Sequence, residues 1–331
     1  MSILKSASHV TSFKSSNGSF SGIIMDTSTA ANTSNQLISI YNTNTTKHLY
    51  WDFSAQNFLW LHFMIGQYLV EPDAGHQWVV VENASGNYIA IEGTTNNDTT
   101  CAYRLVKWDG ATKTTIVTST EIFSIGKTCD IKIDVQVVGG VEFFINGTSQ
   151  GSDSGDYSAW AGINTLKLQG QQSKRSRFKD IIIADEDTRG MFLQRMNITA
   201  NGSETDFTGS YTDIDDLDDT SADYPDDTTF ITSSAAADIS TFAFADLDSA
   251  YDTGFDVIAA TVLVSAKKGT DATGTIAPSI KENLTVGNGA FATLTPNVES
   301  FDSLFHLNPD TGLAWTIAEI NAAEVGVESA A

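Results

Sequence analysis

Apolar and polar residues alternate along most of this chain, in short runs that turn residues separate. Two runs flank the turn Asn83–Asn87, and two more flank Asp109-Gly110, a dipeptide that tolerates positive φ. These four runs are 77–82, 88–92, 102–108 and 113–118. Each pair is predicted to form an antiparallel hairpin.

The clearest alternation begins at Asp130. Its apolar members fall on one side of an extended strand, and Gly139-Gly140 then reverses the chain into a strand at 141–145. The apolar members are Ile131, Ile133, Val135 and Val137. Further strands are predicted at 58–65, 164–169 and 177–184. Many short strands at regular spacing, with no segment typical of a long helix, indicate an antiparallel sandwich.

The second half repeats the strand pattern and adds one helix. Strands are predicted at 228–232, 242–247, 256–266, 274–281 and 291–295, with a strong turn at 308–312. Thr316 and Glu319 have the spacing of a capping box, and Gly326 is predicted to end the helix that follows. The predicted fold class is therefore all-β, with two antiparallel β-sandwich (jelly-roll-like) domains and one short C-terminal helix.

Charge divides the chain near Gly190. The residues up to Gly190 carry 14 basic and 18 acidic side chains, and the remainder carries 4 and 23. We therefore predict a first domain at 1–189 and a second, acidic domain at 190–331. The total formal charge of −23 argues against nucleic acid or an anionic membrane as a partner.

The N-terminal segment lacks an apolar core of signal-peptide length, and the longest apolar run, 58–66, is too short to span a membrane. We therefore expect neither export by a signal peptide nor insertion in a bilayer. Cys101 and Cys129 are expected to be buried thiols, with a single bridge between neighbouring strands as the alternative.

Two late segments, "CDIKIDVQVVGGVEFFINGTSQG" and "NTLKLQGQQSKRSRFKDIIIADEDTRG", carry a family pattern. They resemble the last strands of a concanavalin A-like (laminin-G-like) lectin domain, and the resemblance extends over residues 20–189. Asn146 stands where that family often has Asp, which leaves the turn intact. The resemblance implies a sandwich that binds carbohydrate or protein.

The second half contains "DIDDLDD", "DYPDDTTFITSS", "VIAATVLVSAKKGTDATGTIAPSIKE" and "LNPDTGLAWT". Over residues 205–328 it resembles a domain that recurs in structural proteins of tailed bacteriophages. The resemblance implies a virion component that assembles in the host cytoplasm and needs no signal peptide. Its partners would be other virion proteins and copies of itself, with a trimer as a natural unit.

Eight aspartates lie between Asp213 and Asp227 and suit a hard cation such as Ca²⁺. An EF-hand loop that began at Asp213 would need Gly and Glu where Asp218 and Tyr224 stand, so its motif is incomplete. We read the segment as a solvated acidic connection and expect no metal and no cofactor.

Catalysis finds little support in the sequence. Glycosidases of the concanavalin A-like fold alternate their carboxylates on one face of a strand, whereas 185–187 is a contiguous Asp-Glu-Asp whose side chains alternate between faces. Residues 151–155 resemble a serine-hydrolase loop but hold Asp153 at the nucleophile position. The five histidines lack paired spacing. We therefore expect no catalytic residues.

One loop has the chemistry of a sugar site. Sugar rings stack on aromatic faces while carboxylates accept their hydroxyl groups. The candidate carbohydrate-binding residues are Asp153, Asp156, Tyr157 and Trp160. The alternative is that Trp160 folds back onto the sheet and the acids face solvent.

One basic cluster stands out in the acidic chain: Lys174, Arg175, Arg177 and Lys179. It is predicted either to dock on an acidic domain or virion partner, or to be a solvated strand edge protected against aggregation.

The sequence therefore predicts a non-enzymatic bacteriophage virion structural protein displayed on the particle surface, as a head decoration (cement) protein or as part of a tail fibre or tip. The alternative is a glycan-binding host-adhesion protein, a receptor-binding protein whose ligand is host surface polysaccharide.

Overall fold

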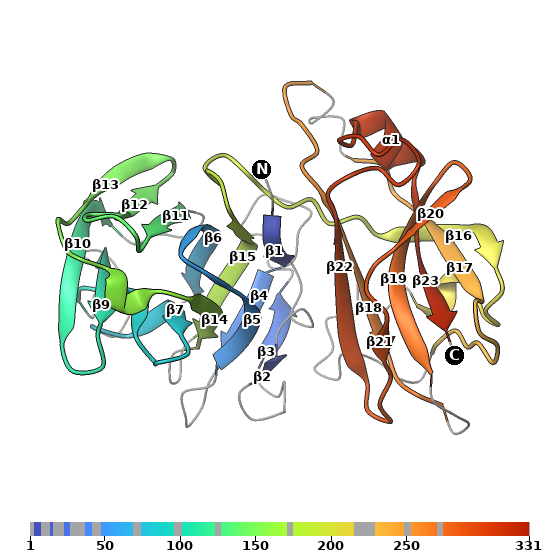
Figure 1. The fold of residues 1–331 in the computed structure, drawn as a ribbon, viewed down its shortest axis with the longest axis horizontal. Coiled ribbons are helices and arrows are strands. Elements are labelled where there is room, and N and C mark those ends of the chain that lie inside the picture. Colours follow the sequence, from blue (N-terminus) through green and yellow to red (C-terminus); the bar gives the residue numbers. More distant parts are fainter. Residues whose placement is uncertain are drawn as a thin grey trace. The chain divides into compact units, whose positions relative to one another are not determined.

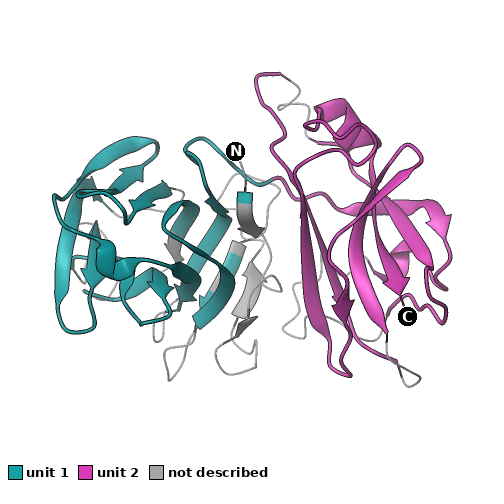
Figure 2. Cartoon of the chain, viewed as in Figure 1, with its two compact units in different colours: residues 1–193 teal, residues 194–331 magenta. Residues whose placement is uncertain are grey.

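The computed structural model describes residues 3–7, 14–15, 23–26, 37–41, 48–68, 74–95, 101–122, 127–170, 175–214, 229–247, 253–269 and 274–330. The chain divides into two compact units, residues 1–193 and 194–331 (Figure 2). The described part is built almost entirely of antiparallel strands, with one short α-helix near the C-terminus (Figure 1). The predicted all-β fold class is confirmed.

Unit 1 contains two large sheets. The first, sheet A, has the order β13-β12-β11-β6-β15-β4-β3, and β1 pairs with β15. Its strands are β1 (Ile3–Ala7), β3 (Ile23–Asp26), β4 (Leu37–Tyr41), β6 (Phe58–Tyr68), β11 (Lys127–Asp134), β12 (Val141–Ile145), β13 (Thr148–Ser152) and β15 (Arg175–Ala184).

The second sheet of unit 1, sheet B, has the order β10-β9-β8-β7-β14-β5-β2. Its strands are β2 (Lys14–Ser15), β5 (His48–Gln56), β7 (Gln77–Asn83), β8 (Tyr88–Gly93), β9 (Ala102–Trp108), β10 (Lys113–Ile122) and β14 (Ile163–Gln169). Both hairpins predicted from the alternation, β7–β8 and β9–β10, are present in this sheet.

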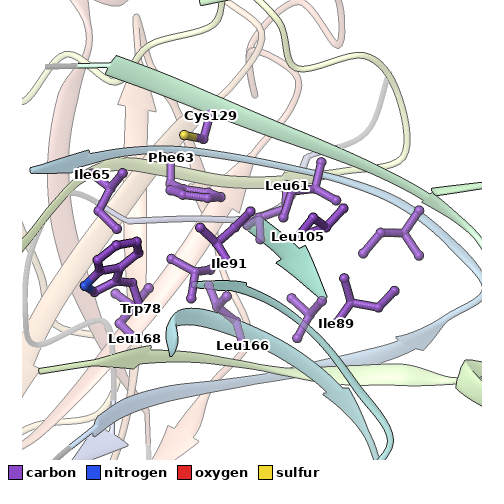
Figure 3. Close-up of a cluster of buried hydrophobic side chains, with 14 of the residues drawn as sticks. Leu61, Phe63, Ile65, Trp78, Ile89, Ile91, Leu105, Cys129, Leu166 and Leu168 are labelled. Carbon is purple, nitrogen blue, oxygen red and sulfur yellow. The ribbon is translucent and has the colours of Figure 1, made fainter. Parts of the chain in front are cut away.

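The core of unit 1 lies between the two sheets. Alternate residues of each strand point inward, so that Leu61, Phe63 and Ile65 of β6 face side chains of sheet B such as Ile91 and Leu166 (Figure 3). All are almost fully buried. Burial of one such side chain contributes roughly 1.5–3 kcal/mol, so this core is the main source of stability for the sandwich.

The turn between β12 and β13 is formed by Asn146 and Gly147, which both adopt positive φ. The strand before β12, which is β11, is shorter than predicted. β11 ends at Asp134, because the backbone N–H of Asp134 bonds to Gly140 O and its carboxylate accepts from the N–H of Gln136. Val137 therefore lies in the turn and is exposed, rather than on the inward face.

Unit 2 packs a six-stranded sheet, sheet C, with a two-stranded ribbon and the helix. Sheet C has the order β16-β17-β23-β19-β20, and β21 pairs with β19; β18 pairs with β22. The strands are β16 (Ile198–Thr205), β17 (Ile239–Phe244), β18 (Ala260–Ala266), β19 (Thr275–Glu282), β20 (Thr285–Asn288), β21 (Ala292–Thr293), β22 (Glu299–Phe305) and β23 (Glu324–Ala330). Val262, Ile280, Trp315 and Ile320 form its core.

The predicted helix is confirmed as α1 (Ile317–Ala322), with Thr316 as N-cap and a complete capping box to Glu319. Its predicted end is wrong. α1 stops at Ala322, and Gly326 lies in β23, where a Cβ would stand 2.2 Å from Ser240 O. Gly326 therefore allows β23 to lie close to β17, and it does not end the helix.

Two strands of the second half are shorter than predicted. Of the predicted strand 228–232, Thr228 lies outside the described residues, and the part that is described contains only a single bridge between Thr208 and Thr232. The predicted strand 291–295 is reduced to β21.

Candidate functional site

The loop predicted to bind sugar connects β13 of sheet A to β14 of sheet B. It contains a short 3-10 turn, η2 (Ser158–Trp160). Tyr157 and Trp160 belong to the core of unit 1, with exposed fractions of 0% and 5%. Asp156 is exposed, and its carboxylate accepts from the backbone and hydroxyl of Ser158. The loop therefore lacks the open aromatic face that the predicted sugar site needs.

Asp153 is the polar centre of this loop. Its carboxylate accepts hydrogen bonds from the Tyr157 hydroxyl at 2.6 Å, from the Gly155 N–H at 3.0 Å and from Lys107 Nζ at 3.1 Å. Partial burial acts to raise the pKa of Asp153, but these hydrogen bonds outweigh it and the pKa lies below its ordinary value. Burial and the neighbouring Asp153 raise the pKa of Tyr157. The polar groups of this cluster thus bond to one another.

Trp160 is held just as firmly. Its indole N–H donates to Tyr88 O at 3.0 Å, and the Asn83 side chain donates to the carbonyl oxygens of Ala159 and Ala161. Lys107 Nζ lies 4.2 Å from the centre of the Tyr157 ring. The loop therefore closes one end of the sandwich, which matches the alternative that the sequence left open for Trp160.

The basic cluster lies on a strand in the middle of sheet A. β15 pairs with β6 and with β4, so it is not a sheet edge. Arg177 and Lys179 each have exposed fractions of only 2%. Lys174 lies outside the described residues, and of Arg175 the structure describes the backbone alone. The two described cations are therefore almost fully buried and do not form a solvent-facing patch.

A different surface has the features of a binding site: the outer face of sheet B. Residues of β8 alternate between the core and this face, so Ile89 and Ile91 point inward while Tyr88 and Glu92 point outward. The register sets Tyr88 opposite Trp108 and Glu92 opposite Arg104. We call Gln77, Tyr88, Glu92, Arg104, Trp108 and Lys113 the sheet B face.

Two aromatic rings form one part of the sheet B face. The rings of Tyr88 and Trp108 are nearly parallel, with centroids 6.3 Å apart and an interplanar angle of 16°. Tyr88 packs over the small outward side chains of Val80 and Ala90, and its hydroxyl accepts a hydrogen bond from Gln77 Nε2 at 2.8 Å. Both rings remain partly exposed. They are fixed in orientation and open to solvent.

An ion cluster forms the other part. The Glu92 carboxylate has an exposed fraction of 0% and pairs with both Arg104 and Lys113, with Lys113 Nζ 3.0 Å from Oε2. The side chains of Arg104 and Lys113 are 28% and 41% exposed. On the neighbouring strands Lys167 pairs with Glu82. Donors therefore reach solvent beside the aromatic pair, whereas the Glu92 carboxylate does not.

The sequence contains a signal for this face. Tyr88-x-Ala90-x-Glu92 and Arg104-x-Val106-x-Trp108 are outward positions of two correctly predicted strands. They belong to different predicted hairpins, however, and only the pairing of β8 with β9 brings them together.

Within the described ranges, no group of three or more His, Cys, Asp or Glu side chains is placed to hold a metal ion. The acidic segment from Asp215 to Asp227 lies outside those ranges, whereas Asp213 completes a capping box with Ser210. In the same described part, no helix has the length and apolarity to cross a membrane. Cys101 and Cys129 are both buried free thiols, as expected.

The comparisons with known proteins reach only the level of overall structure. No protein-family model matches the chain. No curated protein matches it. The chain is similar to the globular domain of T. cruzi calreticulin (10% identity, 56% of this chain and 89% of the other, TM-score 0.42).

Two further similarities are to a protein of unknown function with a galectin-like fold from Bacillus subtilis (11% identity, 55% and 93%, TM-score 0.37) and to alginate lyase Aly36B (9% identity, 46% and 82%, TM-score 0.33).

Proposed function

We propose that this chain is a non-enzymatic binding protein whose first unit recognises carbohydrate on the sheet B face. The observation that carries the proposal is the fixed, partly exposed pair of rings at Tyr88 and Trp108. The C–H faces of a sugar ring pack on aromatic faces, and partly exposed aromatic groups beside oriented polar groups are typical of ligand sites.

The surrounding polar groups suit the same ligand. Gln77 orients the Tyr88 phenol, and Arg104 and Lys113 present N–H donors to hydroxyl or carboxylate oxygens. All of these side chains stand on strands, whose positions vary less than those of loops. A sugar would therefore meet a surface that is organised before binding.

The carboxylates on this face favour binding over hydrolysis. A glycosidase needs one carboxyl group as proton donor and a second as base or nucleophile, on either side of the scissile bond. Glu82 is paired with Lys167, and Glu92 is buried between Arg104 and Lys113. Both carboxylates thus form ion pairs with cations of the protein.

A glycan array screened with the full chain tests the proposal, followed by calorimetric titration of any hit. Trp108→Ala is expected to weaken binding at least tenfold, because about 1.4 kcal/mol of stacking is lost. The matched control is Phe291→Ala, which removes an exposed aromatic ring of unit 2 and should leave the affinity unchanged. Unchanged binding by the Trp108 variant would reject this face.

The second unit supports an additional proposal. We infer from the resemblance of residues 205–328 to a domain of tailed-bacteriophage structural proteins that the chain is carried on a virion, as a head decoration or as part of a tail fibre or tip. Its partners would then be other virion proteins and further copies of itself, with no cofactor required. Glycan binding would give such a protein the role of host adhesion.

Cryo-electron microscopy of virions purified from cells that produce the protein tests the virion proposal. Copies on the capsid lattice would indicate a decoration role, and copies confined to the tail would indicate adsorption. Absence of the protein from purified particles would contradict the proposal and leave a free glycan-binding protein.

A further inference from the structure

Glu92 is a buried carboxylate that two cations share, on a face where we propose that carbohydrate binds. Its side chain has no exposed surface, while Arg104 and Lys113 both reach solvent. A ligand on the sheet B face therefore meets the cations and not the anion. Resting on the proposed function, we infer that the ligand is an acidic polysaccharide whose carboxylate groups bind Arg104 and Lys113.

The charge balance of the cluster favours an anion. Among the residues that the structure describes, two cations pair with one carboxylate, so these three side chains together carry one positive charge. Carboxylates are strong acceptors for guanidinium and ammonium groups, and such charge-assisted hydrogen bonds are stronger than those between neutral groups. A neutral sugar would form weaker hydrogen bonds with these donors.

The wider electrostatics permit the same ligand. The residues up to Gly190 hold 14 basic and 18 acidic side chains, whereas the rest of the chain holds 4 and 23. The chain's strong negative charge is thus concentrated outside the sandwich. Salt at physiological strength screens charges beyond about 8 Å, so the local cluster dominates at the sheet B face.

The spacing of the two parts fits a polymer better than a single sugar. The Cα atoms of Tyr88 and Glu92 are four residues apart on β8, about 13 Å at the rise of an antiparallel strand, although the Tyr88 ring extends toward Gln77, which stands opposite Glu92. The small side chains of Ala90 and Val106 lie between them on the same face. One sugar residue stacked on the aromatic pair therefore leaves a later residue of the same chain to reach Arg104 and Lys113.

The test compares one uronic-acid oligosaccharide with its carboxyl-reduced form, in which each carboxylate has become a neutral hydroxymethyl group. The full chain is titrated with both. We expect the acidic form to bind at least tenfold more tightly and this preference to fall as salt is raised. Lys113→Gln should remove most of the preference while binding of the reduced form stays the same.

Two further variants separate charge from folding. Lys127→Gln removes another ion-paired lysine of unit 1, on β11 of sheet A, and should leave the preference intact. Glu92→Gln keeps the shape of the side chain but releases both cations, so it should increase affinity for the acidic form severalfold. A merely structural role of the cluster would instead weaken both ligands together.

The outcomes distinguish the two levels of proposal. Equal binding of the acidic and reduced forms, unaffected by Lys113→Gln, would overturn the acidic ligand but leave carbohydrate binding standing. Binding of neither these oligosaccharides nor any glycan of the array would overturn both.

Discussion

The Tyr157 hydroxyl donates a 2.6 Å hydrogen bond to Asp153 Oδ1, and the other oxygen of that carboxylate accepts from Lys107 Nζ at 3.1 Å. Asp153 directly follows β13, an edge strand of sheet A, and Lys107 stands on β9 of sheet B. Tyr157 is fully buried in the core between the two sheets. The three side chains therefore join the two sheets where the chain crosses from one to the other.

Tyr157→Phe should destabilise unit 1 by roughly 1.5–3 kcal/mol, because a hydrogen bond to a charged group is lost inside the protein. Urea unfolding at pH 7, followed by tryptophan fluorescence, measures the change. Tyr211→Phe, in unit 2, is the matched control and should unfold like the wild type. An unchanged midpoint for Tyr157→Phe would mean that the hydrogen bond adds no stability.

The same carboxylate predicts a pH dependence. The pKa of Asp153 in the folded protein lies below its ordinary value of 3.8. Its ionised form therefore stabilises the fold fully above about pH 5, and this contribution is lost as the pH falls through the folded pKa.

Asp153→Asn isolates that contribution, since Asn keeps an acceptor but carries no charge. The variant should be less stable than the wild type at pH 7, and the difference in unfolding free energy should shrink steadily below pH 4. A difference that stays constant between pH 7 and pH 3 would show that the charge of Asp153 is not what stabilises the loop.

The strands could be predicted from the sequence because alternation is a local property. The run 102–108 coincides with β9, and the capping box at Thr316 specifies the start of α1. What alternation does not contain is the order of the strands in each sheet. That order sets Tyr88 beside Trp108, so this binding surface could not be predicted from the alternation alone.

The loop predicted to bind sugar has no open aromatic face, for a related reason. Residue types alone made Tyr157 and Trp160 suitable for sugar, but the open end of a sandwich needs large apolar groups to close it, and these two rings do so. Likewise, the density of charge at 174–179 suggested a surface, whereas the side chains of Arg177 and Lys179 are almost fully buried. Both differences come from packing between segments far apart in the sequence.

Cys129 is predicted to be chemically inert in the folded protein. Burial, with the neighbouring Asp130, raises the pKa of its thiol well above the ordinary value, so little reactive thiolate forms. Labelling with a disulfide reagent at pH 8 should be slow in buffer and complete in urea. Rapid labelling of Cys129 in the native protein, located by peptide mass mapping, would contradict the buried position.

The capping box predicts a modest and local effect in unit 2. Thr316 accepts from the Glu319 N–H at 3.2 Å, while Glu319 accepts from the Thr316 N–H at 2.8 Å. Thr316→Ala should cost about 1 kcal/mol, because the first turn of α1 loses its side-chain partner. Calorimetry of unfolding measures the loss, with the exposed Thr293→Ala of β21 as control. Equal transitions for both variants would show that α1 is held by packing alone.

Gly326 tests whether strand packing or helix termination explains a glycine. An ideal Cβ at Gly326 lies 2.2 Å from Ser240 O and 3.0 Å from the Cα of Thr241, both on the neighbouring strand β17. These are backbone atoms and cannot rotate away, so Gly326→Ala must push β23 from β17 and should cost more than about 2 kcal/mol. Gly86→Ala is the contrast. Gly86 has a φ of 79° but open space around its Cβ, so only backbone strain applies, at about 1 kcal/mol. Urea unfolding of both variants should rank Gly326→Ala as the more damaging, and the reverse order would show that β23 and β17 adjust to the added methyl group at little cost.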